Sequence, residues 1–118
     1  MKRFNIIALD FDGTVCKHAF PEIGVAEEKH LKIQRFIRKQ KAMGAMIILW
    51  TCRENTPERA YLDEAIKWCK INNIPIDCVN DNPPHIKAEF GKFAGRKIYA
   101  DLYIDDKALN VDDIGMFE

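Results

Sequence analysis

The stretch Ile6-Ile7-Ala8-Leu9-Asp10-Phe11-Asp12-Gly13-Thr14-Val15 decides the fold and also points to chemistry. Its first four residues are continuously apolar, which is typical of a strand that is buried on both faces of a parallel sheet. Two carboxylates follow at the end of this strand. Because an ionised Asp is costly to desolvate, such a pair needs a cation, hydrogen-bond donors or solvent in a cleft. The pattern therefore predicts a cation site at the end of a core strand.

Two further apolar segments end in polar residues in the same way. Residues 46–50 form a second apolar run, followed by Thr51-Cys52-Arg53, and residues 98–104 alternate as a strand does before Asp105-Asp106. A short strand is expected at residues 77–79. Because the carboxyl ends of parallel strands meet at one edge of the sheet, where ligands bind, we expect these polar residues to converge.

Helical patterns separate the strands. Apolar residues recur at helical spacing over residues 25–43, and Thr56 with Pro57 predicts the N-terminus of a second helix that ends near Asn72. Residues 85–97 show no clean period. The order of elements predicts an α/β fold in a single domain over residues 1–118: a Rossmann-like, mostly parallel sheet with helices on both faces.

The composition excludes several classes of partner. The 118 residues carry 18 basic and 18 acidic side chains, so no overall field attracts nucleic acid or an anionic membrane. No apolar run approaches the roughly 20 residues that span a bilayer. The cysteines form no Cys-x-x-Cys pair, and the N-terminus lacks signal-peptide features, so we expect free thiols and a cytoplasmic location.

Converging carboxylates repel one another, and Mg²⁺, which prefers oxygen ligands, is the natural counter-ion. Such a cation suits a phosphate substrate. Asp10 can then act as a nucleophile, while Asp12 donates a proton to the leaving group and later accepts one from water.

These residues resemble three motifs of the haloacid dehalogenase (HAD) superfamily: Asp10-Phe11-Asp12-Gly13-Thr14-Val15 its first motif, Thr51 its second and Asp105-Asp106 its fourth. The resemblance spans residues 4–107 and implies a Mg²⁺-dependent phosphatase that passes through an aspartyl-phosphate. It implies that Asp10 is the nucleophile, Asp12 the acid/base and Thr51 a donor to phosphate oxygens. Asp10, Asp105, Asp106 and the backbone carbonyl of Asp12 would hold the metal.

The third motif of that superfamily is a lysine that neutralises the phosphate and the nucleophile, and two lysines compete for it. Lys97 lies eight residues before Asp105, a spacing that resembles the small deoxyribonucleotidase branch. Lys87 has the longer spacing that is common elsewhere in the superfamily. We expect Lys97 to fill the role, with Lys87 as the alternative.

The short intervals between the motifs leave no room for a sizeable cap domain. The resemblance therefore implies a capless member with an open site. An open site favours either a bulky substrate, such as the phosphorylated end of a polymer, or a small phosphorylated molecule that a second subunit covers. The sequence does not choose between these two.

Several residues near the motifs have alternative interpretations. Arg53 either contacts the substrate phosphate or pairs with Glu54 or Glu58. We expect Cys52 to contribute its backbone N–H rather than a nucleophilic thiol, and Asn80 to Asn82 to form a turn. The loop over residues 14–24 offers candidates for the substrate entrance, namely Cys16, His18 and Phe20.

Three other functions use similar residues. A signalling receiver domain also arranges acidic residues, Thr and Lys around Mg²⁺, but its acidic pair comes early in the chain, whereas here the pair Asp105-Asp106 comes last. A non-catalytic phosphate-binding module is disfavoured because Asp10 and Asp12 are both present. Phosphotransfer to an acceptor other than water has no visible acceptor site.

Overall fold

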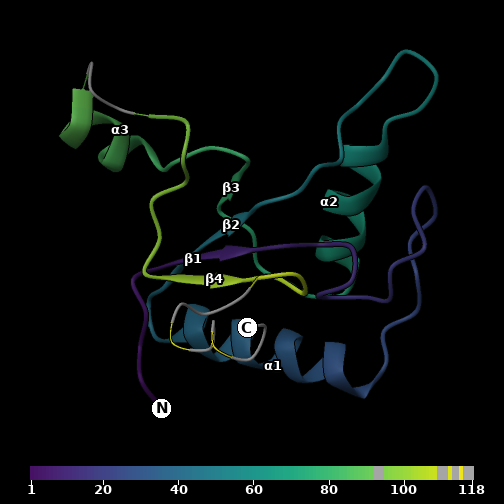
Figure 1. Cartoon of the computed structure of the whole chain (residues 1–118), viewed down its shortest axis with the longest axis horizontal. Coiled ribbons are helices and arrows are strands. Elements are labelled where there is room, and N and C mark those ends of the chain that lie inside the picture. The colour runs from purple at the N-terminus through teal and green to yellow at the C-terminus, as the bar shows by residue number, and fades with distance from the viewer. Residues whose placement is uncertain (92–94, 109–111, 113–114, 116–118) are drawn as a thin grey trace.

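A computed structural model describes residues 1–91, 95–108, 112 and 115 of the chain. Helices and strands alternate along it (Figure 1). In chain order the elements are β1 (Ile6–Leu9), α1 (Glu28–Ala42), β2 (Met46–Leu49), α2 (Tyr61–Ile71), β3 (Cys78–Val79), α3 (Pro84–Phe90) and β4 (Leu102–Ile104). The expected α/β fold is confirmed, and no cap domain occurs among the described residues.

All strand pairs of the sheet are parallel, and the strand order is β3-β2-β1-β4. The chain moves from β1 through β2 to β3 in one direction and then returns past them to place β4 beside β1. Because parallel crossovers are right-handed, this reversal puts α1 and α2 on one face of the sheet and α3 on the other. The reversal also creates a switch point between β1 and β4, the position where open α/β sheets bind ligands.

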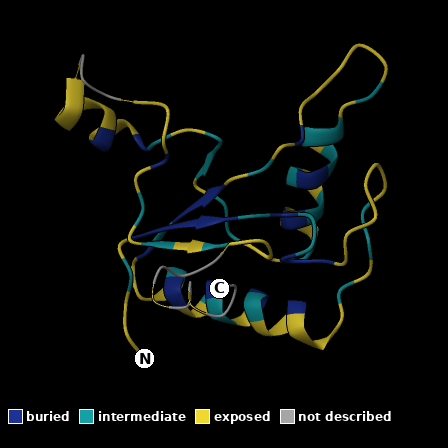
Figure 2. Ribbon diagram, viewed as in Figure 1, coloured by how far each residue is buried: buried dark blue, intermediate teal, exposed yellow. Residues whose placement is uncertain are grey.

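The two faces are covered unequally. The larger apolar cluster joins Ile7, Leu9 and Leu49 of the sheet to Ile37 of α1 and Ala65 of α2. The smaller cluster on the opposite face joins alternate strand residues to α3 and to the segment before β4; its members are Ile6, Ala8, Ile48, Ile86 and Ile98. Figure 2 shows β1 and β2 buried along their length, whereas much of α3 is exposed. The strand that carries the first motif is therefore the centre of the molecule.

The expected start of the second helix is wrong. The Thr56 hydroxyl accepts a hydrogen bond from the Arg59 N–H at 3.1 Å, which closes a turn rather than capping a helix. The helix α2 begins at Tyr61, and the Asn55 side-chain oxygen accepts hydrogen bonds from two of its first N–H groups. The capping oxygen thus comes from a residue six positions before the helix, a distance that cap patterns do not anticipate.

The segment before β4 also differs from expectation. The alternating pattern over 98–104 predicted one strand, but only Leu102–Ile104 pairs with β1. The Tyr99 N–H donates to the Asn82 side chain at 2.7 Å, and the Tyr103 hydroxyl donates to the Ile98 carbonyl at 2.5 Å. These bonds replace ladder bonds. The stretch 85–97, unassigned from sequence, contains α3.

In the described part of the chain, no helix combines the length and apolarity that crossing a membrane requires.

Candidate active site

Three carboxylates meet at the carboxyl end of the sheet. Leu9 of β1 pairs with Ile104 of β4, so the residues that follow them, Asp10 and Asp105, emerge side by side. The Asp10 N–H donates to the Ile104 carbonyl at 2.9 Å and continues the ladder by one step. Oxygens of Asp10, Asp105 and Asp106 all lie within 4.8 Å of one another. We call these three residues the acidic cluster.

The charges of Asp105 and Asp106 oppose the ionisation of Asp10. Burial, followed by the charge of Asp105, raises the pKa of Asp10 from 3.8 to about 6. Burial alone would also raise the pKa of Asp106, but the Lys107 charge and hydrogen bonds with Asp105 and Asp10 outweigh it and lower that pKa. Asp105 and Asp106 both oppose the ionisation of Asp10, and three carboxylates so close together provide a set of oxygen ligands for a hard divalent cation. The donor set therefore fits Mg²⁺.

Gly13 makes room for this cluster. Its φ angle is +87°, a conformation that L residues with side chains rarely adopt, and a Cβ built there would collide with the Asp106 carboxylate. The Thr14 hydroxyl, one residue later, donates to the Asp10 carboxylate at 3.1 Å. The Gly-Thr pair thus shapes the cluster, because Gly13 leaves space for Asp106 and Thr14 orients Asp10.

We expect Gly13→Ala to lower the stability of the protein and to disturb the acidic cluster. The strained backbone and the displaced Asp106 should lower the free energy of unfolding by about 1–3 kcal/mol and the Mg²⁺ affinity at least about 10-fold. Thermal denaturation with and without Mg²⁺ measures both effects. Gly95→Ala is the matched control, because a Cβ at Gly95 meets no atom within 4 Å. An unchanged Mg²⁺ affinity in Gly13→Ala would contradict the expectation.

Thr51 lies at the end of β2 in a loop that Asn80 holds in place. The Thr51 N–H donates to the Asn80 side chain at 2.8 Å, and the Thr51 hydroxyl accepts from the Arg53 N–H at 3.1 Å. Asn80 adopts a positive φ of 51° and donates its own N–H to the Leu49 carbonyl. The sequence indicated a turn at Asn80 but gave no sign that its side chain positions the second motif.

Arg53 lines the candidate cleft and pairs with Asp12 rather than with Glu54 or Glu58. It is 2% exposed, and it forms a two-pronged ion pair with Asp12, Nε to Oδ2 at 2.8 Å and Nη2 to Oδ1 at 2.9 Å. Arg53 thus contacts the predicted acid/base directly. The Asp12 carboxylate lies outside the acidic cluster, because Arg53 holds it.

A cleft of about 450 Å³ brings the site residues together. It is lined by Asp10, Asp12, His18, Phe20, Thr51, Cys52, Arg53, Asp105, Asp106 and Lys107. His18 and Phe20 thus lie where the sequence placed them as candidates for the entrance. Cys16 does not, because it is fully buried in the larger core cluster. Lys107, whose Nζ lies 3.5 Å from Asp106, is a cleft residue that the sequence analysis missed.

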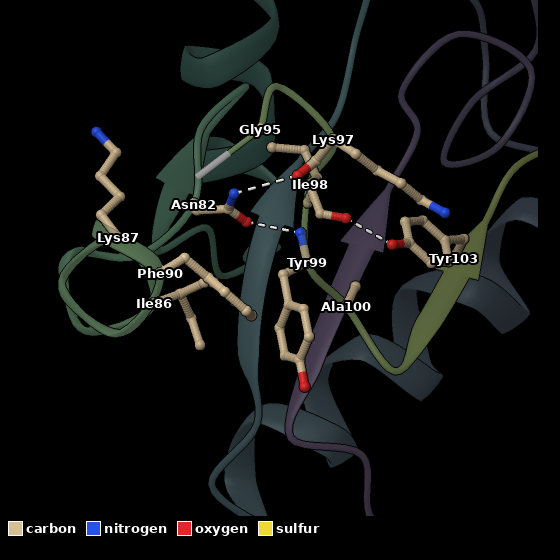
Figure 3. A pocket seen from close by; sticks show the side chains of 10 residues that line it. All are labelled: Asn82, Ile86, Lys87, Phe90, Gly95, Lys97, Ile98, Tyr99, Ala100 and Tyr103. Carbon is tan, nitrogen blue, oxygen red and sulfur yellow. Dashed lines mark hydrogen bonds between the residues drawn. The ribbon is translucent and has the colours of Figure 1, made fainter. Parts of the chain in front are cut away.

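Neither lysine considered for the third motif lines this cleft. Lys87 forms an ion pair with Asp81. It lines a different pocket, drawn in Figure 3, where its side chain points away from the other lining residues. The Lys97 Nζ lies 5.6 Å from the centre of the Tyr103 ring. Lys97 and Asp105 both line a separate cavity of about 640 Å³. Of the two lysines, Lys97 is thus the one that shares a cavity with a member of the acidic cluster, Asp105.

All four cysteines are free thiols, as expected. Burial raises the pKa of Cys16 to about 11 and that of Cys69 to about 12, so both thiols are poor nucleophiles. Cys52 is exposed and lines the cleft, where its backbone lies next to Thr51.

The fold and the sequence were compared with known proteins. No family model matches the chain, and no curated protein matches it. Among solved structures, a conserved protein from Bacteroides thetaiotaomicron is 31% identical, with a TM-score of 0.71, over 92% of this chain and 79% of that one. The chain belongs to the family of that conserved protein. That protein is described as conserved and by no activity, so membership of its family brings no substrate with it.

Proposed function

We propose that the protein is a Mg²⁺-dependent phosphatase of the HAD type, which hydrolyses a phosphomonoester through an aspartyl-phosphate. The observation that supports this most is the acidic cluster, with Asp10, Asp105 and Asp106 within 4.8 Å and Thr51 and Asp12 in the same cleft. A structural ion-pair network would match each carboxylate with a cation, whereas among the described residues Lys107, near Asp106, is the cation that accompanies the three carboxylates. A bound Mg²⁺ neutralises this charge and that of the substrate phosphate.

The chain's own residues then divide the reaction between them. The Asp10 carboxylate attacks phosphorus, the bond from phosphorus to the leaving oxygen breaks, and that oxygen takes a proton from Asp12. Water next attacks the phosphorus of the acyl phosphate and gives a proton to Asp12, which releases inorganic phosphate and restores Asp10. Thr51 donates hydrogen bonds to phosphate oxygens throughout, as fixed donors in a cleft do.

No cap domain covers the cleft in the described part of the chain, which favours as substrate either the phosphorylated end of a polymer or a small molecule that a second subunit covers. The four free thiols suit a reducing compartment, and the proposed location is the cytoplasm.

Phosphate release from an activated aryl phosphate in the presence of Mg²⁺ tests the proposal. Turnover that does not exceed that of Asp10→Asn protein would remove the enzymatic function. A screen of nucleotides, sugar phosphates and phosphorylated polymer ends then identifies the leaving group.

The third-motif lysine is expected to be Lys97. Replacing Lys97 by Ala should lower kcat/KM about 10²-fold, because the positive charge that shares a cavity with Asp105 is lost. Lys87→Ala should leave kcat/KM unchanged, since Lys87 is engaged by Asp81. Steady-state kinetics on the aryl phosphate compares the two. Full activity in Lys97→Ala would transfer the role to another lysine, and Lys107→Ala, the cleft lysine, is the third variant of the set.

A further inference from the structure

The Arg53 side chain is completely engaged by the protein. A guanidinium group has five N–H donors. Two of them bind the Asp12 carboxylate, a third binds the Glu22 carbonyl at 3.0 Å, and Nη1 makes longer bonds of 3.4 Å to the carbonyls of Pro21 and Tyr61. No donor remains for a substrate. Arg53 acts on other parts of the site.

Two aromatic rings also contact the same guanidinium. Its central carbon lies 5.2 Å from the centre of the Phe11 ring and 5.0 Å from that of the Phe20 ring. Phe11 is fully buried, whereas Phe20 is 49% exposed and lines the cleft. Cation–π contacts of this kind stabilise a buried guanidinium in addition to its hydrogen bonds. Arg53 therefore joins the end of β1, the loop over residues 20–22 and the start of α2 into one unit.

This pairing restricts where Asp12 can carry a proton. Each of its oxygens accepts one hydrogen bond from Arg53, so the lone pairs that face the guanidinium are occupied. A carboxylate oxygen has a second lone pair, and only those turned away from Arg53 remain for a proton. The two-pronged geometry also fixes the rotation of the carboxyl plane, which a single point charge would leave free.

We propose that Arg53 is a positioning residue, which holds the Asp12 carboxyl in the single orientation from which it hands a proton to the leaving oxygen and later takes one from water. The assignment rests on the proposed phosphatase function. Arg53 itself exchanges no proton and touches no substrate. Its contribution should therefore be confined to the steps in which Asp12 takes part.

Two substrates with different leaving groups test this. An alkyl phosphate needs a proton on its leaving oxygen, whereas p-nitrophenyl phosphate releases a stable anion and needs none. In Arg53→Lys the charge remains but the fork is lost, so kcat/KM for the alkyl phosphate should fall about 10²-fold, as a lost general acid implies. For the aryl phosphate it should change less than about threefold. The ratio of the two values does not depend on the fraction of folded enzyme.

The hydrolysis step gives a second readout. Because kcat/KM includes no step after the leaving group departs, a slower attack of water appears only in kcat and in the transient phase. Arg53→Lys should therefore release a rapid burst of p-nitrophenolate, close to one per active site, before a slow steady state. Asp12→Asn should show the same burst, and the double variant should be little worse than Asp12→Asn alone, because the two residues act as one unit.

Arg59→Lys is the matched control. Arg59 pairs with Glu22 and Glu64 and so supports the same loop, but it makes no contact with Asp12. It should leave the ratio of the two substrates unchanged. Arg53→Gln repeats the experiment with a neutral side chain in case Lys destabilises the site. Equal losses on both substrates, or additive losses in the double variant, would overturn the positioning role while the phosphatase stands. A wild-type protein that hydrolyses neither substrate would overturn the phosphatase itself, and the positioning role with it.

Discussion

Asp10→Asn protein should fold normally and release no measurable phosphate. The amide is a far weaker nucleophile than the carboxylate, so no acyl phosphate forms, and losing a nucleophile typically costs at least about 10³-fold in kcat. The substitution also removes a charge that Asp105 opposes, which is the second cause of the raised Asp10 pKa. In metal-free solution the variant should therefore melt at a higher temperature than the wild type, as is common for relieved active sites.

The two measurements together identify the cause of the lost activity. Asp63→Asn, an exposed position on α2, is the control and should change neither the activity nor the melting temperature. A variant that loses activity and also melts earlier would point to unfolding rather than to loss of a nucleophile. Residual turnover within tenfold of the wild type would show that the phosphoryl group is not transferred to Asp10.

Chelation of Mg²⁺ should abolish turnover completely, and added Mg²⁺ should restore it. The reason is electrostatic: the acidic cluster and a phosphate dianion carry charge of the same sign, and without a cation the substrate is repelled. Phosphate release in a chelator, followed by back-titration with Mg²⁺, measures the effect. Turnover that persists in excess chelator would contradict a metal role for the cluster.

The pH dependence of metal binding follows from the raised pKa of Asp10. Above about pH 6 this carboxyl is ionised, and Mg²⁺ binds without displacing a proton; below it each pH unit costs up to about tenfold in affinity. Between pH 3.8 and about pH 6, the native state of the metal-free protein holds a proton on Asp10 that the unfolded chain has released. The free energy of unfolding therefore falls as the pH rises through this window.

The rise in melting temperature on adding Mg²⁺ should consequently be larger at about pH 7.5 than at about pH 5. Differential scanning fluorimetry with Ca²⁺ and Na⁺ as comparison ions measures this rise. A rise that is independent of pH would place the bound cation away from Asp10.

The sequence was informative where one residue type has few uses. A continuous apolar run that ends in Asp10 predicted both a central strand and its polar end, because burial and charge are incompatible there unless a ligand intervenes. The positive φ of Gly13, one of the few conformations that favour a glycine, was not among the predictions from the sequence.

The contacts of long side chains were not readable in this way. Arg53 reaches Asp12 across 41 positions of sequence, and its nearest acidic neighbours along the chain proved irrelevant. Likewise the Asn55 side chain accepts a hydrogen bond from the Leu62 N–H at the start of α2. The Asn82 side chain accepts one from the Tyr99 N–H, in a segment whose alternating pattern predicted a strand. A side chain with several rotatable bonds can satisfy many partners, and only the tertiary packing selects among them.

The pairing of β1 with β4 joins segments of the candidate site that lie far apart in the sequence. Asp101 accepts hydrogen bonds from the N–H groups of Asn5 and Ile6, and the ladder above it sets Asp10 beside Asp105. The two halves of the cluster are thus separated by almost the whole chain, and the closing contacts are the most distant in sequence. A chain that has formed β1, β2 and β3 but not β4 holds Asp10 without Asp105 and Asp106 beside it. The three carboxylates therefore meet only when β4 pairs with β1, so this edge of the sheet depends on contacts between the two ends of the described chain.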